Sequence, residues 1–263
     1  MDPKIAIITI CYNSEKYIED AIKSVVNQNY DNLEYIIIDG GSTDKTLEIV
    51  DKYRDKITHV VSEKDEGISD AFNKGILMTD AELIGIVNSD DFLYDNDVLL
   101  KVAKHYEPHV DVYRGNEIIR NCISGEEYTL YPTMQVSKIP AKFNICHMAM
   151  FVRKSAFEKF GMYDKEYRYA MDKELLFRFM KNGAVCKQID VTVGVFRLGG
   201  VSQTYNSSRR NESIKIAKML GANPFELLVY RVYLFLKDSV KGVLQKVCPK
   251  INSKLRFRTG KSK

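Results

Sequence analysis

Two adjacent carboxylates follow a short apolar segment in the first half of the chain. Residues 83–87 read LIGIV, and the sequence NSDD comes directly after them, so Asp90 and Asp91 stand side by side. Like charges repel, and in extended backbone the two side chains would point to opposite faces and meet different partners. A divalent cation held by one carboxylate, with waters and substrate phosphates completing its shell, would offset the repulsion. A solvent-exposed turn explains the pair equally well.

A third carboxylate ends another apolar segment. Residues 33–39 read LEYIIID, a buried strand that ends at Asp39, and the sequence GGSTDKT follows. By itself this pattern is typical of a turn whose small polar residues cap the next helix. The carboxyl ends of parallel strands, however, meet at one edge of a sheet, where ligands bind. Asp39 is therefore a candidate to accept a hydrogen bond from the N–H of a base, beside Asp90 and Asp91.

The elements that must position these residues alternate between strand-like and helix-like patterns. Buried strands are indicated at residues 5–10, 33–39, 57–63 and 81–87, and helices between them at residues 14–28, 46–55 and 68–78. This alternation is the βαβ pattern of an α/β fold with a parallel sheet covered by helices. Beyond residue 99 the chain reads as short strands and loops at 111–145, helices at 152–159 and 173–183, and one or two strands at 185–198.

The composition excludes several classes of protein. With 263 residues, of which 45% are hydrophobic, the chain can bury a sizeable core. Its five cysteines are scattered and form no C-x-x-C pair, which argues against a disulfide framework and a zinc site. No glycine-rich dinucleotide fingerprint follows the first strand, and the chain has no phosphate loop of the form G-x-x-x-x-G-K-[ST].

The C-terminal segment, residues 224–263, has a charge of its own. It contains ten Lys and Arg against Glu226 and Asp238, a net +8, which leaves −4 for the rest of a chain whose total is +4. Because a nucleic-acid-binding fold carries its positive charge on the domain itself, no nucleic-acid partner is expected. Apolar residues recur at helical spacing between 225 and 247, which predicts either a helix packed on the domain or an interfacial helix on anionic lipid. The charge favours the membrane.

Six motifs occur in one order along the chain: TICYN, IIIDGGSTDKT, SEKDEGISDAFNKG, NSDD, ICHMAMF and AMDKELLFR. Together they resemble the family 2 glycosyltransferases, especially bacterial enzymes of O-antigen, capsule or exopolysaccharide assembly, over residues 4–205. The resemblance implies the GT-A nucleotide-diphospho-sugar transferase fold in residues 1–223, with a mainly parallel central sheet flanked by helices. Residues 1–110 would form the nucleotide-sugar-binding half, 111–205 the acceptor-side half, and 224–263 a basic amphipathic helical extension.

The resemblance implies an inverting, metal-dependent transfer of a sugar from a UDP-sugar to a glycan. Asp91 would hold Mg²⁺ or Mn²⁺ on the diphosphate, and Asp172 would be the base that removes the proton of the acceptor hydroxyl. By pattern alone Asp172 is the N-cap of the helix that follows it. The family's usual first carboxylate, three residues before the metal ligand, is Asn88 here. The acceptor would be a lipid-diphosphate-linked saccharide in lipopolysaccharide or related surface polysaccharide biosynthesis, which places a cytoplasmic, peripheral enzyme at the inner face of the cell membrane.

The resemblance also assigns residues to the donor and the acceptor. The residues expected near the donor stand after strands or in the glycine-containing motif, and they are Thr9, Tyr12, Asn13, Asp39, Gly67, Asn73, Lys74, Asp90 and Arg197. Asp39 would read the uracil N–H, Asp90 would approach the ribose, and Arg197 would close over the diphosphate or be an ordinary surface cation. His147 would border the acceptor, although its apolar neighbours also fit a core histidine.

Two other functions compete with this interpretation. A sugar-nucleotide pyrophosphorylase has a similar fold, but it usually carries a glycine-rich basic loop after the first strand, and TICYNSEKY has none. A non-catalytic nucleotide-sugar-binding protein would not need Asp91 and Asp172, and both are present. We therefore expect a glycosyltransferase.

Overall fold

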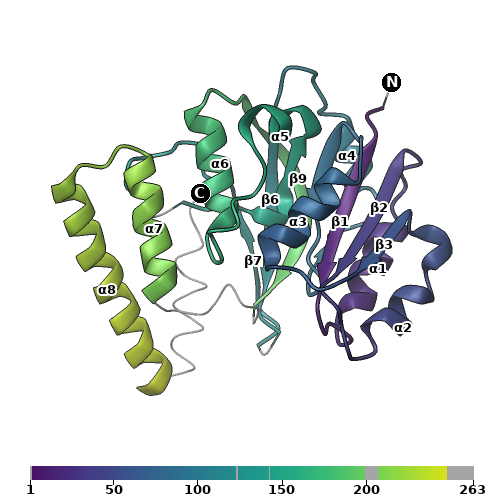
Figure 1. Ribbon diagram of the computed structural model, residues 1–263, viewed down its shortest axis with the longest axis horizontal. Helices are drawn as coiled ribbons and strands as arrows, with labels where there is room; N and C mark the ends of the chain where they lie inside the picture. Colours follow the sequence, from purple (N-terminus) through teal and green to yellow (C-terminus); the bar gives the residue numbers. More distant parts are fainter. Residues whose placement is uncertain (1, 123, 142, 199–206, 248–263) are drawn as a thin grey trace.

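One nine-stranded sheet organises the protein (Figure 1). The computed structural model describes residues 2–122, 124–141, 143–198 and 207–247. The strands are β1 (Ile5–Cys11), β2 (Leu33–Asp39), β3 (His59–Ser62), β4 (Leu83–Ile86), β5 (Phe92–Leu93), β6 (Val112–Arg120), β7 (Glu127–Leu130), β8 (Met150–Arg153) and β9 (Cys186–Arg197). Their order in the sheet is β3-β2-β1-β4-β8-β6-β9-β5, and β7 pairs with β6 beside this path.

Helices cover both faces of this sheet (Figure 1). The α-helices are α1 (Ile18–Val26), α2 (Thr46–Asp51), α3 (Ile68–Leu77), α4 (Val98–Ala103), α5 (Lys154–Phe160), α6 (Met171–Lys181), α7 (Ser207–Met219) and α8 (Pro224–Val247), with short 3₁₀ helices η1 (Arg54–Lys56) and η2 (His147–Ala149). Alternate residues of β1 pack to opposite sides, because side chains alternate along a strand. Ile7 joins the core under α1 and α4, whereas Ile8 joins the core under α3, α5 and α6.

The first half of the sheet is parallel. β1 pairs with β2 and with β4, and β2 pairs with β3, all in parallel. The register places Cys11 opposite Asp39 and Ile8 opposite Ile86, so β1, β2 and β4 end at the same edge. This confirms the predicted α/β class and the βαβ arrangement of the first half of the chain.

The second half of the sheet is mixed. β8 runs antiparallel to β4 and β6, and β9 runs parallel to β6 but antiparallel to β5. The prediction of only short strands and loops at 111–145 was wrong for β6, a nine-residue strand near the middle of the sheet. Three buried polar residues in β6, Arg114, Asn116 and Glu117, interrupt the apolar pattern by which a buried strand is recognised.

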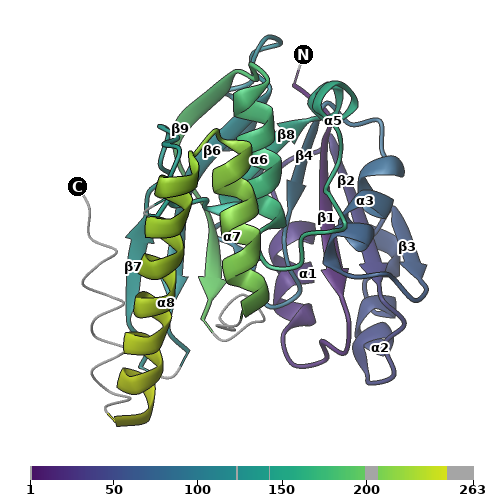
Figure 2. The same ribbon diagram turned by 60° about the vertical axis from the view of Figure 1, so that its left-hand side comes forward.

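Two helices, α7 and α8, lie side by side at one end of the molecule, with α8 outermost (Figures 1 and 2). Tyr230 and Leu234 of α8 are buried with Ala217 of α7, and Arg210 forms an ion pair with Asp238 at 2.9 Å. One face of α8 therefore packs on the domain. Within the described part of the chain, no helix combines the length and the apolar character that crossing a membrane requires.

Candidate active site

Three loops meet where β1, β2 and β4 end. The backbone N–H of Asn13 donates to Ser42 Oγ at 2.8 Å, and the N–H of Thr43 donates to Asn13 Oδ1 at 2.9 Å. Asn13 adopts a left-handed backbone conformation with φ 47°, which asparagine tolerates better than most residues. The hydroxyls of Ser14 and Ser89 are hydrogen-bonded at 2.9 Å, which ties the loop after β1 to the turn before Asp90. The polar residues of the three strand ends thus form one connected edge.

Asp39, the last residue of β2, is fully buried and accepts hydrogen bonds at both carboxylate oxygens. Oδ2 accepts from the N–H groups of Gly41 and Ser42 and from the hydroxyl of Ser62 at 2.7 Å, and Oδ1 accepts from the Ser42 hydroxyl and the Cys11 thiol. Burial alone would raise the pKa of Asp39, but these hydrogen bonds outweigh it and lower the pKa below its usual value. A ligand N–H would have to replace one of these donors.

Asp90 and Asp91 lie in a turn between β4 and β5. The expectation that extended backbone directs their side chains to opposite faces was therefore wrong. The N–H of Asp91 donates to the carbonyl of Asn88 at 3.1 Å. Asp91 is fully buried; its Oδ1 accepts from the backbone N–H of Arg197 at 2.8 Å and its Oδ2 from the Asn88 side chain at 3.2 Å. Asn88, which replaces the family's usual carboxylate, is therefore a neutral donor to Asp91.

The two neighbouring carboxyls suit a divalent cation. Burial raises the pKa of Asp91 well above its usual value, and the negative charge of Asp90 raises it further. Burial also raises the pKa of Asp90. Negative charge crowded in this way favours a cation, and Mg²⁺ or Mn²⁺ needs only one or two carboxylates when phosphates and waters complete its shell. The described residues contain no group of three or more His, Cys, Asp or Glu that could hold a metal by itself, so substrate would have to supply ligands.

Arg197 lies at the end of β9 and is held by protein contacts. Its guanidinium donates to the carbonyl of Asp90 at 3.0 Å, forms an ion pair with Asp20 at 2.6 Å, and lies over the rings of Tyr17 and Phe92. The side chain thus braces the Asp90–Asp91 turn against α1. The two glycines of the predicted closing loop, residues 199 and 200, lie outside the described residues.

Asp172 is the second residue of α6, whose N-cap is Ala170. Its Oδ1 accepts from the N–H of Lys173 at 2.8 Å, and within the described part of the chain Oδ2 has no protein donor. Asp172 is half-buried, and its charge acts on two neighbouring groups. Burial raises the pKa of Glu117 to about 8, and the negative charge of Asp172 contributes to this rise. Burial lowers the pKa of His147, although the negative charge of Asp172 partly opposes that decrease.

Glu117, a residue not expected from sequence, connects the two groups of carboxylates. It is 4% exposed in β6, and its Oε1 accepts from the N–H of Met148 at 3.2 Å. Glu117 also contributes to the raised pKa of Asp91, so it lies within electrostatic reach of both Asp91 and Asp172. A glutamate amid the apolar residues of YRGNEIIR was the one signal that could have identified it.

Two predicted donor residues lie in or after β1. Thr9 is fully buried and its Oγ1 accepts from the hydroxyl of Tyr35 at 3.1 Å. Tyr12 is 63% exposed, and its ring lies beside Gly40 at the edge where Asp39 ends β2. Tyr12 is thus open to a ligand, whereas Thr9 supports the strand from within.

The predicted residues of the DEGISDAFNKG motif belong to α3. Gly67 is its N-cap with φ 121°, a conformation that favours glycine. Asn73 is buried and exchanges two hydrogen bonds with the backbone of Tyr163, at 2.8 and 3.0 Å, which anchors the loop before α6. Lys74 forms an ion pair with Glu63 at 2.7 Å. Gly67 thus allows the turn into α3, whereas the side chains of Asn73 and Lys74 are committed to protein partners.

His147 begins η2 and lies next to α3. Its ring centroid is 5.6 Å from that of Phe72, and its Nδ1 is buried without a hydrogen-bond partner among the described residues. The residue is only partly buried as a whole, and it is near Asp172. An unpartnered ring nitrogen beside the candidate base is compatible with a place at the acceptor.

Glu212 is a second functional residue that the sequence did not indicate. It comes from α7 and is 7% exposed. Its Oε1 accepts from the N–H of Arg168 at 3.0 Å, and its Oε2 accepts from the N–H groups of Tyr169 and Ala170, both at 2.8 Å. The carboxylate therefore holds the backbone directly before Asp172. No periodicity marks α7, so no signal in the sequence could have identified this contact.

Comparison with known proteins gives one consistent result. A sequence model described as glycosyl transferase family 2 matches residues 6–161. A PGL/p-HBAD biosynthesis glycosyltransferase of Mycobacterium bovis is 27% identical over 87% of this chain and 91% of its own length. An uncharacterized glycosyltransferase of Rickettsia typhi is 30% identical over 70% of this chain and 60% of its own length.

Solved structures share the fold. The mannosyltransferase PcManGT of Pyrobaculum calidifontis, in complex with GDP-Man and Mn²⁺, matches with a TM-score of 0.64 and 17% identity over 98% of this chain and 80% of its own. S. aureus TarS in complex with UDP-GlcNAc matches with a TM-score of 0.63 and 20% identity over 82% of this chain and 65% of its own. Both likenesses are to the GT-A fold.

Proposed function

The chain belongs to glycosyl transferase family 2, and from this premise we propose that it moves one sugar from a UDP-sugar to a saccharide acceptor with inversion at the anomeric carbon. It is a glycosyltransferase with a GT-A nucleotide-sugar-binding fold. The donor nucleotide, the stereochemistry and the dependence on one Mg²⁺ or Mn²⁺ ion are the parts that we propose.

The observation that carries the proposal is the sequence of linked carboxylates from the sheet edge to α6. Asp39 ends β2 and Asp91 comes after β4, the two strands that flank β1 in parallel, and Glu117 is in electrostatic reach of both Asp91 and Asp172. These carboxylates come from positions as far as 133 residues apart in the sequence, from Asp39 to Asp172. A donor diphosphate at Asp90 and Asp91 would then lie between the base-reading edge and the candidate catalytic base.

Each residue has a distinct task in this mechanism. Asp39 accepts a hydrogen bond from the N–H of the uracil. To make room for this donor, the hydroxyl of Ser62 gives up its own hydrogen bond to Asp39 Oδ2. Asp91 and Asp90 hold the diphosphate through the cation, which supplies positive charge to the departing UDP. Asp172 uses Oδ2 to accept the proton of the acceptor hydroxyl as the new C–O bond forms, because a hydroxyl is a poor nucleophile until its proton is removed.

The acceptor in this proposal is a saccharide carried on a lipid diphosphate, and the enzyme works at the inner face of the cell membrane in surface polysaccharide biosynthesis. The net +8 of residues 224–263 supports this location, because basic segments are attracted to anionic lipid. A sugar-nucleotide pyrophosphorylase is disfavoured, since the loop after β1 is tied to its neighbours by Asn13 and Ser14 and has no glycine-rich basic segment to bind a nucleoside triphosphate.

Asp172→Asn tests the assigned base. The variant should bind UDP and Mn²⁺ with unchanged affinity in calorimetry and should lose transfer by at least about 100-fold, the range of general-base catalysis. Glu166→Gln is the matched control, because Glu166 has a 76% exposed side chain and forms a surface ion pair with Lys215. Equal loss of UDP affinity and transfer in Asp172→Asn would show a structural role and refute the assignment. A panel of UDP- and GDP-sugars, with and without Mn²⁺, identifies the donor.

A further inference from the structure

The outer face of α8 is apolar and exposed. We define this face by Phe225, Leu228, Val229, Val232, Phe235 and Leu236, whose exposed fractions are 52–73%. A monomeric soluble protein rarely exposes so many large apolar residues together. A face of this kind normally marks a surface that another partner covers.

The outer face is opposite the face that packs on α7. At 100° per residue, Val232 and Leu236 point away from Tyr230 and Leu234, which are buried. Among the side chains described from residue 225 to 239, no charged residue falls within the outer face. A helix that is apolar on both sides is normally buried on both sides, whereas the contacts of α8 with α7 and with Ile139 and Ala141 involve its opposite face, the one that carries Tyr230 and Leu234.

The charges around the outer face distinguish between a lipid surface and a second copy of the chain. On the flanks of the outer face, Arg231 and Lys237 are balanced by Glu226 and Asp238, whereas residues 248–263 contain six Lys and Arg and no acidic residue. Two copies in contact through this helix would bring two segments of net +8 together, which like-charge repulsion opposes. An anionic bilayer would instead attract the positively charged C-terminal segment of a single chain, and it would cover the apolar residues of α8.

We propose that the outer face of α8 lies on an anionic bilayer, with its apolar side chains among the lipid headgroups and upper acyl chains. Aromatic residues such as Phe225 and Phe235 suit this depth, and the helix is parallel to the surface because it is already packed on α7. This inference specifies the surface that the proposed function requires and rests on that function only for the identity of the acceptor.

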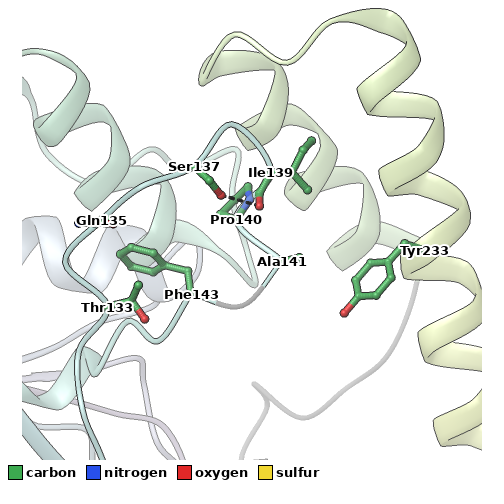
Figure 3. Close-up of a pocket in the computed structure, with 8 residues that line it drawn as sticks. All are labelled: Thr133, Gln135, Ser137, Ile139, Pro140, Ala141, Phe143 and Tyr233. Carbon is green, nitrogen blue, oxygen red and sulfur yellow. Dashed lines mark hydrogen bonds between the residues drawn. The ribbon is translucent and has the colours of Figure 1, made fainter. Parts of the chain in front are cut away.

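The orientation of α8 relates the bilayer to the active site. In both ribbon views, its C-terminal end lies at the same end of the molecule as the carboxyl ends of β1 and β9 (Figures 1 and 2). A cavity of about 320 Å³ lies between residues 133–143 and Tyr233 of α8, with Ile139, Pro140 and Phe143 among its walls (Figure 3). Apolar surface therefore continues from α8 toward the acceptor-side half of the domain.

Vesicle co-sedimentation of the full chain tests the proposal. The wild type should bind vesicles of phosphatidylcholine with 30% phosphatidylglycerol, and binding should weaken on raising the salt and on removing the phosphatidylglycerol. The double variant Val232→Glu/Leu236→Glu should bind at least about 30-fold more weakly, since it places two charges in the apolar face. The matched control is Leu77→Glu/Val185→Glu, which adds the same charge at apolar residues outside α8 that are 66% and 44% exposed.

The control should bind as the wild type does, and both double variants should keep the wild-type melting temperature, because all four side chains face solvent. Equal binding by Val232→Glu/Leu236→Glu and the wild type would overturn the proposal. Absence of vesicle binding by the wild type would also overturn the proposal. If sedimentation equilibrium then showed a dimer that Val232→Glu/Leu236→Glu dissociates, a second copy of the chain would cover the outer face instead of lipid. The assay contains no donor or acceptor, so its failure is distinct from failure of the proposed transfer, which UDP and Mn²⁺ calorimetry reports separately.

Discussion

Replacing Glu212 should loosen the start of the helix that carries the candidate base. The carboxylate of Glu212 accepts three backbone N–H groups at 2.8–3.0 Å and is 7% exposed. In Glu212→Gln one carboxylate oxygen becomes an NH₂ group, which cannot accept a hydrogen bond. The remaining oxygen can then accept either the two N–H groups bound by Oε2 or the single N–H bound by Oε1. The side chain also loses its negative charge, so the hydrogen bonds that remain are weaker. A hydrogen bond to a charged group contributes roughly 1.5–3 kcal/mol, so we expect Glu212→Gln to lose about 2–3 kcal/mol of stability.

Glu212→Ala should lose more, about 4 kcal/mol, because it leaves all three N–H groups without this acceptor. Urea unfolding measures both values, and Glu166→Gln, in an exposed ion pair with Lys215, should change stability by less than about 0.5 kcal/mol. Because the three N–H groups precede Asp172, Glu212→Gln should also lower kcat by about tenfold or more and leave the affinity for UDP unchanged. A stability loss for Glu212→Gln no larger than that of the control would refute the reasoning, as would loss of UDP affinity without loss of kcat.

The other predictions concern the sheet and the metal. The folded protein keeps the proton of Glu117 up to about pH 8, whereas the unfolded chain releases it near pH 4.5. Stability should therefore fall as the pH rises from 4.5 to 8, by up to about 1.4 kcal/mol per pH unit. Urea unfolding should show that this decline is absent in Glu117→Gln. Gly85→Ala should cost about 1–3 kcal/mol in urea unfolding, because the new Cβ would meet Phe151 Cε1 at 2.6 Å; an unchanged midpoint would contradict the packing. Mn²⁺ at 100 times its Kd should add about 2.7 kcal/mol of stability, reversed by EDTA and absent in Asp91→Asn; no gain in the wild type would contradict a metal at this turn.

The first half of the fold could be predicted because its signals are local. β2 spans the predicted residues 33–39, and α3 spans Ile68–Leu77 within the predicted 68–78, since buried parallel strands and amphipathic helices repeat their apolar residues at fixed intervals. β6 and α7 have no such pattern. β6 carries three buried polar residues whose partners come from other segments, and α7 is mainly polar, so its helix is stabilised by contacts such as that of Glu212 with the loop before α6.

The candidate site divides in the same way. Position at strand ends was enough to mark Asp39, Asp90 and Asp91 as candidates, whereas Asp172 was selected through the resemblance to family 2 glycosyltransferases, since by pattern alone it was expected to be a helix N-cap. Sequence could not show that Asn73 is bound by Tyr163, or that Arg197 braces the turn of Asp90 rather than standing free. Each of these contacts joins a side chain to the backbone carbonyl of a residue 90 or more positions away in the sequence.

The sequence by itself determined the family, the α/β class, the positions of the acidic residues and the helical character of the C-terminal segment. Only the tertiary structure decided that Glu117 is within electrostatic reach of both Asp91 and Asp172, that Glu212 holds the backbone before α6, and that α8 packs through one apolar face while the other remains exposed. The physical reason is that periodicity and capping depend on neighbours within a few residues, whereas burial, pKa and hydrogen-bond partners depend on segments that only folding brings together.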